Sequence, residues 1–146
     1  MESNFNFKNF SIVIPIFNEE EILEESTNAI FSLCKRMEID FEIIFSENGS
    51  TDKTKAIAEE LTNKHPEIKI ISNPEPNYGN ALKTGFKIAK NDLVISFDID
   101  YYSESFLSEA LKLESEYSGI TASKRLGSSE DGRRFIRRLA TNFFVI

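Results

Sequence analysis

Short apolar runs alternate with longer amphipathic stretches along this chain. The apolar runs cover residues 10–16, 41–45, 68–72, 93–100 and 119–123. Near-continuous apolar runs of about this length are typical of strands that are buried on both faces of a parallel sheet. We therefore expect strands at these five positions.

The stretches between the runs repeat their apolar residues at helical spacing. They predict helices over residues 18–37, 52–65, 80–90 and 104–117. Strands that alternate with helices indicate a parallel sheet with right-handed crossovers. The sequence thus predicts an α/β domain in which helices flank a mostly parallel, Rossmann-like sheet.

Local signals refine the bounds of the second and third helices. Ser50 or Thr51 is expected to cap the helix that begins near Asp52. Gly85 lies inside the next helix and predicts close packing on the sheet. Asn91 follows that helix and is expected to take the left-handed exit conformation that glycine usually fills.

Composition narrows the class of protein. The chain has 146 residues, of which 40% are hydrophobic and 28% charged, enough for one domain with a buried core. Its apolar runs are far shorter than the roughly 20 residues that span a bilayer, and no signal-peptide pattern opens it. The single cysteine, Cys34, lies among apolar helix positions and is expected to be buried. We expect a cytoplasmic protein.

The net charge of −7 is unevenly distributed. Residues 124–146 carry six Lys and Arg against two acidic residues, and the remainder of the chain is strongly acidic. An acidic surface repels nucleic acid, so this distribution of charge argues against nucleic acid as a partner of residues 1–123. It indicates that residues 124–146 bind an anion. Residues 133–143 place apolar side chains at helical spacing beside arginines, as in a basic amphipathic helix.

The run over residues 93–100 ends in two carboxylates, Asp98 and Asp100. Side chains two apart on an extended strand point to the same side, about 7 Å apart, so this pair can converge on one cation. Mg²⁺ and Mn²⁺ prefer oxygen ligands, and Mg²⁺ usually binds one or two carboxylates together with substrate phosphates. The alternative is that the pair only ends a strand and caps the following helix.

Loops leave the predicted carboxyl ends of strands at residues 15–19, 47–52 and 98–102. In a doubly wound sheet such loops meet at the switch point, where a nucleotide could place its base and ribose on the first two and its diphosphate at the third. No Gly-x-Gly-x-x-Gly or Walker loop follows the first strand, which argues against dinucleotide cofactors and ATP hydrolysis.

Segments in the same order along the chain resemble the signatures of family-2 glycosyltransferases with the GT-A fold, most of all those of dolichol-phosphate mannose synthases. These segments are residues 13–20, 42–54, 77–85 and 97–100. The resemblance implies a single glycosyltransferase domain over residues 1–146, incomplete at its C-terminus. It divides into a nucleotide-sugar-binding core, residues 10–123, and a basic acceptor and membrane segment, residues 124–146.

The resemblance also implies a metal-dependent, inverting transfer from a GDP- or UDP-sugar to a polyprenyl phosphate, with Mg²⁺ or Mn²⁺ as cofactor. Asp98 would face the ribose or the metal, and Asp100 would bind the metal. The choice of base stays open, because this chain has Glu47-Asn48 where the family commonly has Asp-Asp. The nucleoside-binding positions would be Pro15, Phe17, Glu19, Glu47 and Asn48.

Carried over by position, Arg137 and Thr141 match an arginine and a hydroxyl residue that contact the acceptor phosphate in the family. Lys124 and Arg125 lie near a further basic position of that kind. Together with Asp98 and Asp100, Arg137 would be catalytic. The basic segment also predicts peripheral contact with the cytoplasmic membrane face.

Two alternatives stay open. Transfer to a sugar or protein hydroxyl normally needs a carboxylate base, and only Glu130 and Asp131 follow Tyr117. A phosphate acceptor is already anionic and needs no base, which favours the first interpretation. The other alternative is a fragment that binds a nucleotide sugar without catalysis.

Overall fold

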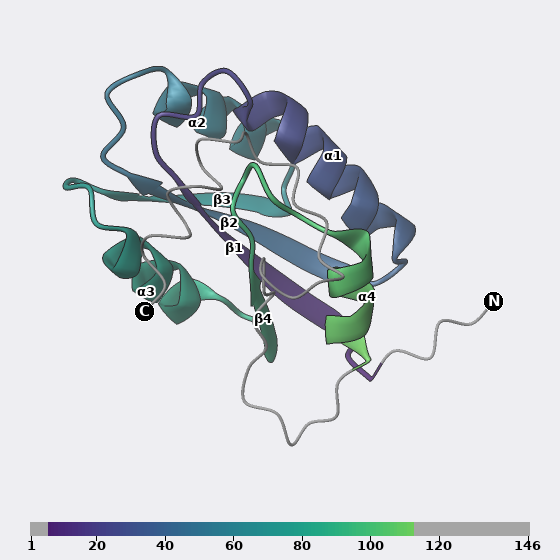
Figure 1. Cartoon of the computed structure of the whole chain (residues 1–146). Coiled ribbons are helices and arrows are strands. Elements are labelled where there is room, and N and C mark those ends of the chain that lie inside the picture. Colours follow the sequence, from purple (N-terminus) through teal and green to yellow (C-terminus); the bar gives the residue numbers. More distant parts are fainter. Residues whose placement is uncertain (1–5, 113–146) are drawn as a thin grey trace, which may run out of the picture.

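The computed structural model describes residues 6–112, which form a parallel sheet with helices on both faces (Figure 1). Strands and helices alternate strictly, as the sequence predicts. The strand expected at residues 119–123 and the end of the last predicted helix lie outside the described residues. The elements are β1 (Asn9–Ile16), α1 (Leu23–Arg36), β2 (Asp40–Asn48), α2 (Thr54–Lys64), β3 (Ile68–Asn73), α3 (Tyr78–Ile88), β4 (Leu93–Ser96) and α4 (Glu104–Leu111).

The strand order is β3-β2-β1-β4, and every neighbouring pair is parallel. β1 therefore lies inside the sheet, where Phe10 pairs with Phe41 on one side and with Leu93 on the other. Parallel strands in this order require a crossover connection between each strand and the next, which the helices supply. All carboxyl ends meet at one edge of the sheet.

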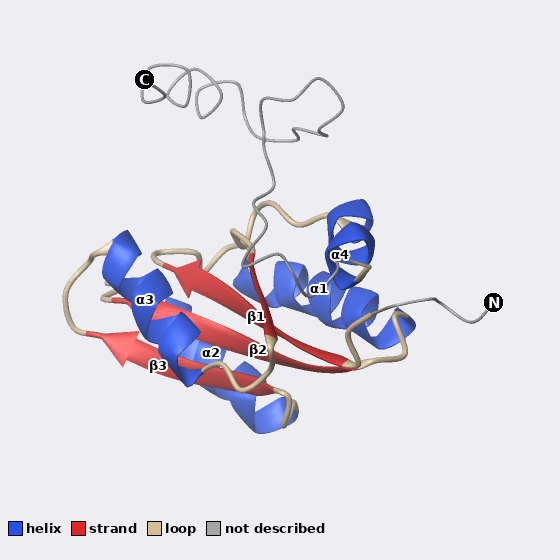
Figure 2. Cartoon of the chain, turned by 90° about the horizontal axis from the view of Figure 1, so that it is seen from below, coloured by secondary structure: helices blue, strands red, loops and turns tan. Residues whose placement is uncertain are grey.

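The two faces of the sheet are covered unequally (Figure 2). α1 and α2 cover one face, whereas α3 lies on the other. α4 joins the first layer, where Arg36 of α1 pairs with Glu104 of α4 at 2.9 Å. The main hydrophobic core fills this layer and includes Phe10, Ile12, Ile14, Ile30, Leu33, Phe45, Leu61, Phe97 and Leu107.

α3 lies against the opposite face through small residues. Ala81 and Gly85 are buried, and the backbone at Gly85 lies directly against Val13 of β1. The hydroxyl of Ser46 donates a hydrogen bond of 2.7 Å to the carbonyl of Ala81. The close packing expected at Gly85 is confirmed.

A buried carboxylate, Glu42, ties the β1, β2 and β3 strands together on the α3 face. Its oxygens accept hydrogen bonds from the Ser11 hydroxyl at 2.7 Å, from the Lys90 N–H at 2.7 Å and from the Lys69 ammonium. Burial raises the pKa of Glu42, but the hydrogen bonds from Lys69, Lys90 and Ser11 outweigh it, so the pKa lies below its ordinary value. Glu42 is therefore a buried anion with its hydrogen bonds satisfied.

Two expectations about helix ends are wrong. Neither Ser50 nor Thr51 caps α2, since the cap position is Lys53 and Asp52 Oδ1 accepts the Thr54 N–H at 2.9 Å. Asn91 does not adopt a left-handed conformation. Its amide group instead donates a hydrogen bond of 2.8 Å to the Phe10 carbonyl, which fixes the α3–β4 connection without a positive φ.

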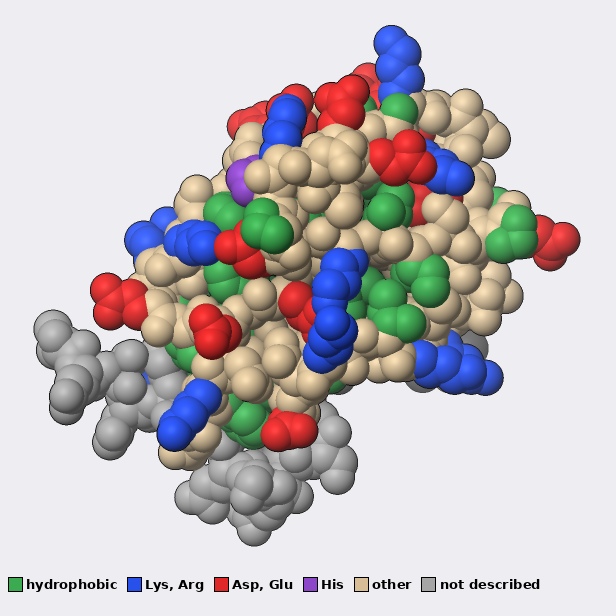
Figure 3. Space-filling model, turned by 180° about the vertical axis from the view of Figure 1, so that it is seen from behind, with side chains coloured by type: hydrophobic (Ala, Val, Ile, Leu, Met, Phe, Trp, Pro, Cys, Tyr) green, Lys and Arg blue, Asp and Glu red, His purple; other side chains and the backbone are tan. Residues whose placement is uncertain are grey.

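The surface is mixed in charge. Figure 3 shows the face opposite to that of Figure 1, where acidic and basic side chains are interspersed and hydrophobic ones form only small groups. Exposed ion pairs such as Lys64–Glu24, at 3.4 Å, contribute little to stability. Cys34 is buried, as expected, and burial raises the pKa of its thiol to about 12. Within residues 6–112, no helix has both the length and the apolarity to cross a membrane.

Candidate functional site

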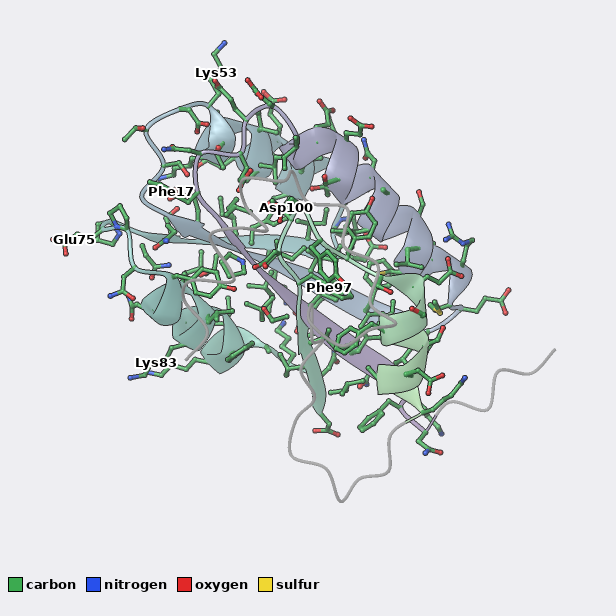
Figure 4. The ribbon with its side chains drawn as sticks, in the orientation of Figure 1. Phe17, Lys53, Glu75, Lys83, Phe97 and Asp100 are labelled. Carbon is green, nitrogen blue, oxygen red and sulfur yellow. The ribbon has the colours of Figure 1, made fainter. Side chains whose placement is uncertain are left out.

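The site residues that the sequence predicts within residues 6–112 lie at the carboxyl end of the sheet. Phe17 follows β1, Glu47 and Asn48 end β2, and Asp98 and Asp100 follow β4. Figure 4 shows Phe17 and Asp100 at the same end of the sheet, Phe17 beyond β1 and Asp100 beyond β4. Ligands of open α/β sheets bind at this end, so the loops are placed for a shared site.

Asp98 and Asp100 belong to a tight turn and not to an extended strand. β4 ends at Ser96, and the Tyr101 N–H donates a hydrogen bond of 2.9 Å to the Asp98 carbonyl. The sequence predicts that the alternation of an extended strand aligns the two carboxylates. This prediction is wrong, because the backbone turns between Asp98 and Tyr101 and Asp100 lies within that turn. Both carboxylates nevertheless belong to the same turn at the carboxyl end of β4. Asp98 is half-buried there and Asp100 is exposed.

The carboxylate oxygens of this turn could supply part of the coordination of a cation, with a bound substrate supplying the rest. Among residues 6–112, no group of three or more His, Cys, Asp and Glu side chains could hold a metal ion by itself. Two carboxylates with phosphate and water oxygens are the usual environment of Mg²⁺ at nucleotide sites. Asp98 and Asp100 are thus suited to a metal that arrives with a diphosphate, not to a resident metal in a protein cage.

The β1–α1 and β2–α2 loops are joined by hydrogen bonds. The side-chain Oδ1 of Asn18 accepts a hydrogen bond of 2.9 Å from the Thr51 N–H. The backbone N–H of Asn18 donates a hydrogen bond of 3.1 Å to the Ser50 hydroxyl. Asn18 has a left-handed backbone with φ of 52°. One residue on, the Glu19 N–H donates to the Thr54 hydroxyl at 2.7 Å. The two loops therefore form one connected surface beside Phe17.

Two acidic side chains, those of Asp52 and Glu20, also join the β1–α1 and β2–α2 loops at the start of α2. Asp52 Oδ2 accepts the Glu20 N–H at 3.3 Å, and Glu20 Oε2 accepts the Lys53 N–H at 3.0 Å. Burial raises the pKa of Asp52, but hydrogen bonds from the side chain and backbone of Thr54 outweigh it, so the pKa lies below its ordinary value. With the Thr54 N–H, which donates to Asp52 Oδ1 at 2.9 Å, two N–H groups at the start of α2 are bonded to acidic side chains.

Glu47 and Asn48 end β2 and are buried, although the sequence favours a loop from Ser46 onward. Glu47 is 3% exposed, and its Oε1 accepts the Ser50 N–H at 2.6 Å. The Asn48 side chain accepts the Asn77 N–H at 2.7 Å, which joins the β2 end to the β3–α3 loop. Gly49 follows with φ of 72°, a conformation that side chains rarely adopt.

The remaining predicted positions differ in exposure. Pro15 is half-buried within β1, Glu19 is half-buried beyond it, and the Phe17 side chain is 41% exposed. An exposed aromatic ring at the carboxyl end of a strand offers a flat apolar surface to a ligand. The acceptor-phosphate positions lie outside the described residues: Lys124, Arg125, Arg137 and Thr141.

Tyr78 is a site neighbour whose contact the sequence does not reveal. Its hydroxyl donates a hydrogen bond of 3.0 Å to Asp98 Oδ1. Burial of the hydroxyl and the charge of Asp98 raise the pKa of Tyr78 to about 12. The only signal in the sequence is an aromatic residue beside Gly79 in one of the recognised segments, which does not specify a partner.

Comparison with known proteins gives a consistent family. A family model described as glycosyl transferase family 2 matches residues 11–144. The undecaprenyl-phosphate 4-deoxy-4-formamido-L-arabinose transferase of Proteus mirabilis is 37% identical over 92 residues, covering 62% of this chain and 28% of that protein. The protein of the same name from Pseudomonas fluorescens is 37% identical over 94 residues, covering 62% of this chain and 27% of that protein. The chain thus spans less than a third of the length of these relatives.

Solved structures agree on the fold. The mannosyltransferase PcManGT from Pyrobaculum calidifontis, in complex with GDP-Man and Mn²⁺, has a TM-score of 0.62 at 21% identity, covering 75% of this chain and 33% of that one. TarS from S. aureus in complex with UDP-GlcNAc has a TM-score of 0.57 at 25% identity, covering 70% of this chain and 30% of that one. The sheet and its helices therefore have the GT-A arrangement that the sequence predicts.

Proposed function

This chain belongs to glycosyltransferase family 2, and on that premise we propose that it transfers a sugar from a nucleotide diphosphate to a polyprenyl phosphate. The observation that carries the proposal is that the Asn18 loop, the end of β2 and the Asp98 turn lie at the carboxyl ends of three neighbouring strands, β1, β2 and β4. The Proteus and Pseudomonas relatives, whose names specify undecaprenyl phosphate, support this acceptor class.

The donor nucleoside binds beside β1 and β2 in this proposal. Phe17 presents an exposed ring, and the buried Glu47 carboxylate, held by the Ser50 N–H at 2.6 Å, would reach the nucleoside from the end of β2. Pro15, Glu19 and Asn48 complete this part of the site. The solved complexes with GDP-Man and UDP-GlcNAc support a nucleotide sugar as the donor class, and the choice of base stays open.

The diphosphate lies against the Asp98 turn. Asp98 and Asp100 would hold a divalent cation there together with the phosphate oxygens, and Mg²⁺ or Mn²⁺ would neutralise charge that develops on the leaving diphosphate. Without a cation the two carboxylates repel a diphosphate, so binding of the donor depends on metal. The PcManGT complex, which contains GDP-Man and Mn²⁺, supports a divalent cation beside the nucleotide sugar.

The acceptor meets the domain through its basic segment. We assign residues 10–123 to the nucleotide-sugar core and residues 124–146 to the acceptor and to membrane contact. Arg137 and Thr141, with Lys124 and Arg125, would hold the acceptor phosphate, which attacks the anomeric carbon directly and needs no general base. The polyprenyl phosphate class, not a particular sugar or chain length, is what we propose.

The direct test is sugar transfer by the whole 146-residue chain. Radiolabelled UDP-glucose, UDP-GlcNAc and GDP-mannose would each be incubated with undecaprenyl phosphate, with Mn²⁺ or with EDTA, and label in the organic phase measured. With whichever of these donors the site accepts, we expect transfer of label to depend on Mn²⁺ and on the acceptor. Asp100→Asn should lower the rate by about 100-fold or more, whereas Glu24→Gln on the exposed side of α1 should not.

The outcomes separate the alternatives. Metal-dependent binding of a nucleotide diphosphate without transfer to any acceptor would indicate a nucleotide-sugar-binding fragment. Transfer to sugar or protein hydroxyls, with none to the polyprenyl phosphate, would contradict the acceptor class. Equal transfer in EDTA and in Mn²⁺ would contradict the role of Asp98 and Asp100.

A further inference from the structure

Tyr78 and Asp98 connect two loops across the carboxyl end of the sheet. The Tyr78 hydroxyl lies 3.0 Å from Asp98 Oδ1 and donates a hydrogen bond to it. Tyr78 begins α3, which follows β3, whereas Asp98 follows β4. β2 and β1 lie between β3 and β4 in the sheet, so this bond joins two connections that follow non-neighbouring strands.

Hydrogen bonds fix the start of α3, where Tyr78 lies. The Asn77 N–H donates to Asn48 of β2 at 2.7 Å, and the Asn77 side chain caps α3 by accepting the Asn80 N–H at 2.9 Å. One turn further on, Ser46 holds the Ala81 carbonyl at 2.7 Å. A tyrosine side chain has only two rotatable torsions, so a fixed helix start determines where its hydroxyl can lie.

The carboxylate, by contrast, belongs to a turn. The Asp98 carbonyl accepts the Tyr101 N–H at 2.9 Å, a hydrogen bond that involves the backbone and not the carboxylate. The torsion about the Cβ–Cγ bond is broad in aspartate, and a hydrogen bond to one oxygen narrows it. A carboxylate that is oriented in advance binds its ligand more tightly, because less freedom is lost on binding.

From this geometry we infer that Tyr78 is a positioning residue that orients Asp98 toward the metal–diphosphate group of the donor. The inference rests on the proposed function of the site and adds to it a residue of the β3–α3 loop. The Tyr78 ring is 54% exposed, so removal of its hydroxyl leaves the hydrophobic core untouched. Its effect is therefore expected in binding and not in stability.

The test is calorimetry on the whole chain with UDP and with GDP, each in Mn²⁺ and in EDTA. Tyr78→Phe should weaken nucleotide binding in Mn²⁺ by about tenfold or more, the loss expected for one hydrogen bond to a charged group. Binding in EDTA and the melting temperature should stay unchanged. Phe86→Leu is the matched control, because Phe86 is an aromatic residue on the same helix with 45% exposure.

A double-mutant cycle identifies the residue through which Tyr78 acts. If the hydroxyl acts through Asp98, Tyr78→Phe should have no further effect in an Asp98→Asn background. Additive losses would overturn the inference, and so would equal affinity of Tyr78→Phe and wild type in Mn²⁺. Failure of the wild-type chain to bind either nucleotide in Mn²⁺ would overturn the proposed function itself, and the inference with it.

Discussion

Gly85 and Val13 are in such close contact that a Cβ atom at Gly85 would lie 2.4 Å from Cγ1 of Val13. This contact sets the distance between α3 and the sheet, because Val13 belongs to β1 and Gly85 to the buried side of α3. Any larger side chain at position 85 would require the Val13 side chain or the backbone of α3 to shift. The start of α3, and with it Tyr78, is held relative to the sheet in part by this pair.

Gly85→Ala should therefore destabilise the fold even though alanine favours helix formation. The added methyl group overpacks the contact, at a cost of about 1–3 kcal/mol in the free energy of unfolding, measured by urea denaturation. Val13→Ala in the same chain should recover part of the loss, because it removes the opposing methyl groups. A Gly85→Ala variant as stable as wild type would contradict the role of this contact.

Glu42→Gln should lower stability in a pH-dependent way. Because the pKa of Glu42 lies below its ordinary value, the folded state favours the carboxylate, which stabilises the protein above the unfolded pKa of about 4.3. That contribution disappears as the pH falls through the folded pKa. We expect the variant to be about 2 kcal/mol less stable at pH 7, with a difference that shrinks below about pH 4.

Urea denaturation at pH 7, 5, 4 and 3 measures this difference. Glu24→Gln is the control, since the Glu24 side chain is 61% exposed and its pairing with Lys64 at 3.4 Å should contribute less than about 1 kcal/mol at any pH. A constant difference between wild type and Glu42→Gln across the pH series would argue against a buried anion.

Asn18 offers a matched pair of substitutions at one backbone position. Asn18→Gly removes the acceptor for the Thr51 N–H but accepts the φ of 52°, whereas Asn18→Ala also strains the backbone. The free energy of unfolding of Asn18→Ala should thus be about 1 kcal/mol lower than that of Asn18→Gly, and both variants should be less stable than wild type. Hydrogen exchange at Thr51 should be faster in both variants. Greater stability of the alanine variant would contradict the left-handed assignment.

Arg137→Ala should separate acceptor binding from donor binding. If Arg137 holds the acceptor phosphate, the KM for undecaprenyl phosphate should rise by about tenfold or more, while the affinity for the nucleotide diphosphate stays unchanged. Arg133→Ala, four positions earlier in the same basic segment, is the control. Flotation on vesicles with and without anionic lipid would show whether the segment also binds the membrane. An unchanged KM would refute the assignment of Arg137.

The fold follows from the sequence where the signal is local. Apolar runs such as residues 10–16 and helical spacing such as that of α1 depend only on neighbouring residues, and each predicted strand and helix within the described residues is present. The polar end of β2 is different. Glu47 and Asn48 look like loop residues, but partners distant in sequence, Asn73 and Asn77, bond to their backbone and side-chain oxygens and keep them buried.

The candidate site shows the same limit. The sequence identifies Asp98 and Asp100 by residue type and by their position after an apolar run. Their geometry depends on a turn that the Tyr101 N–H closes, and their neighbour Tyr78 comes from the start of α3. Contacts between loops depend on strand order, which periodicity does not encode. Single-residue signals therefore predict the members of the site better than their arrangement.

The inside position of β1 also has a consequence during synthesis on the ribosome. β1 and β2 can pair early, but the partner on the other edge of β1 comes much later: Ser96 bonds to the carbonyl of Val13, 83 positions before it. Until β4 has left the exit tunnel, the hydrogen-bonding groups along that edge have no strand beside them. An open strand edge can pair with other nascent chains, so this domain should aggregate most readily when translation pauses after β1 has emerged from the tunnel and before β4 has done so.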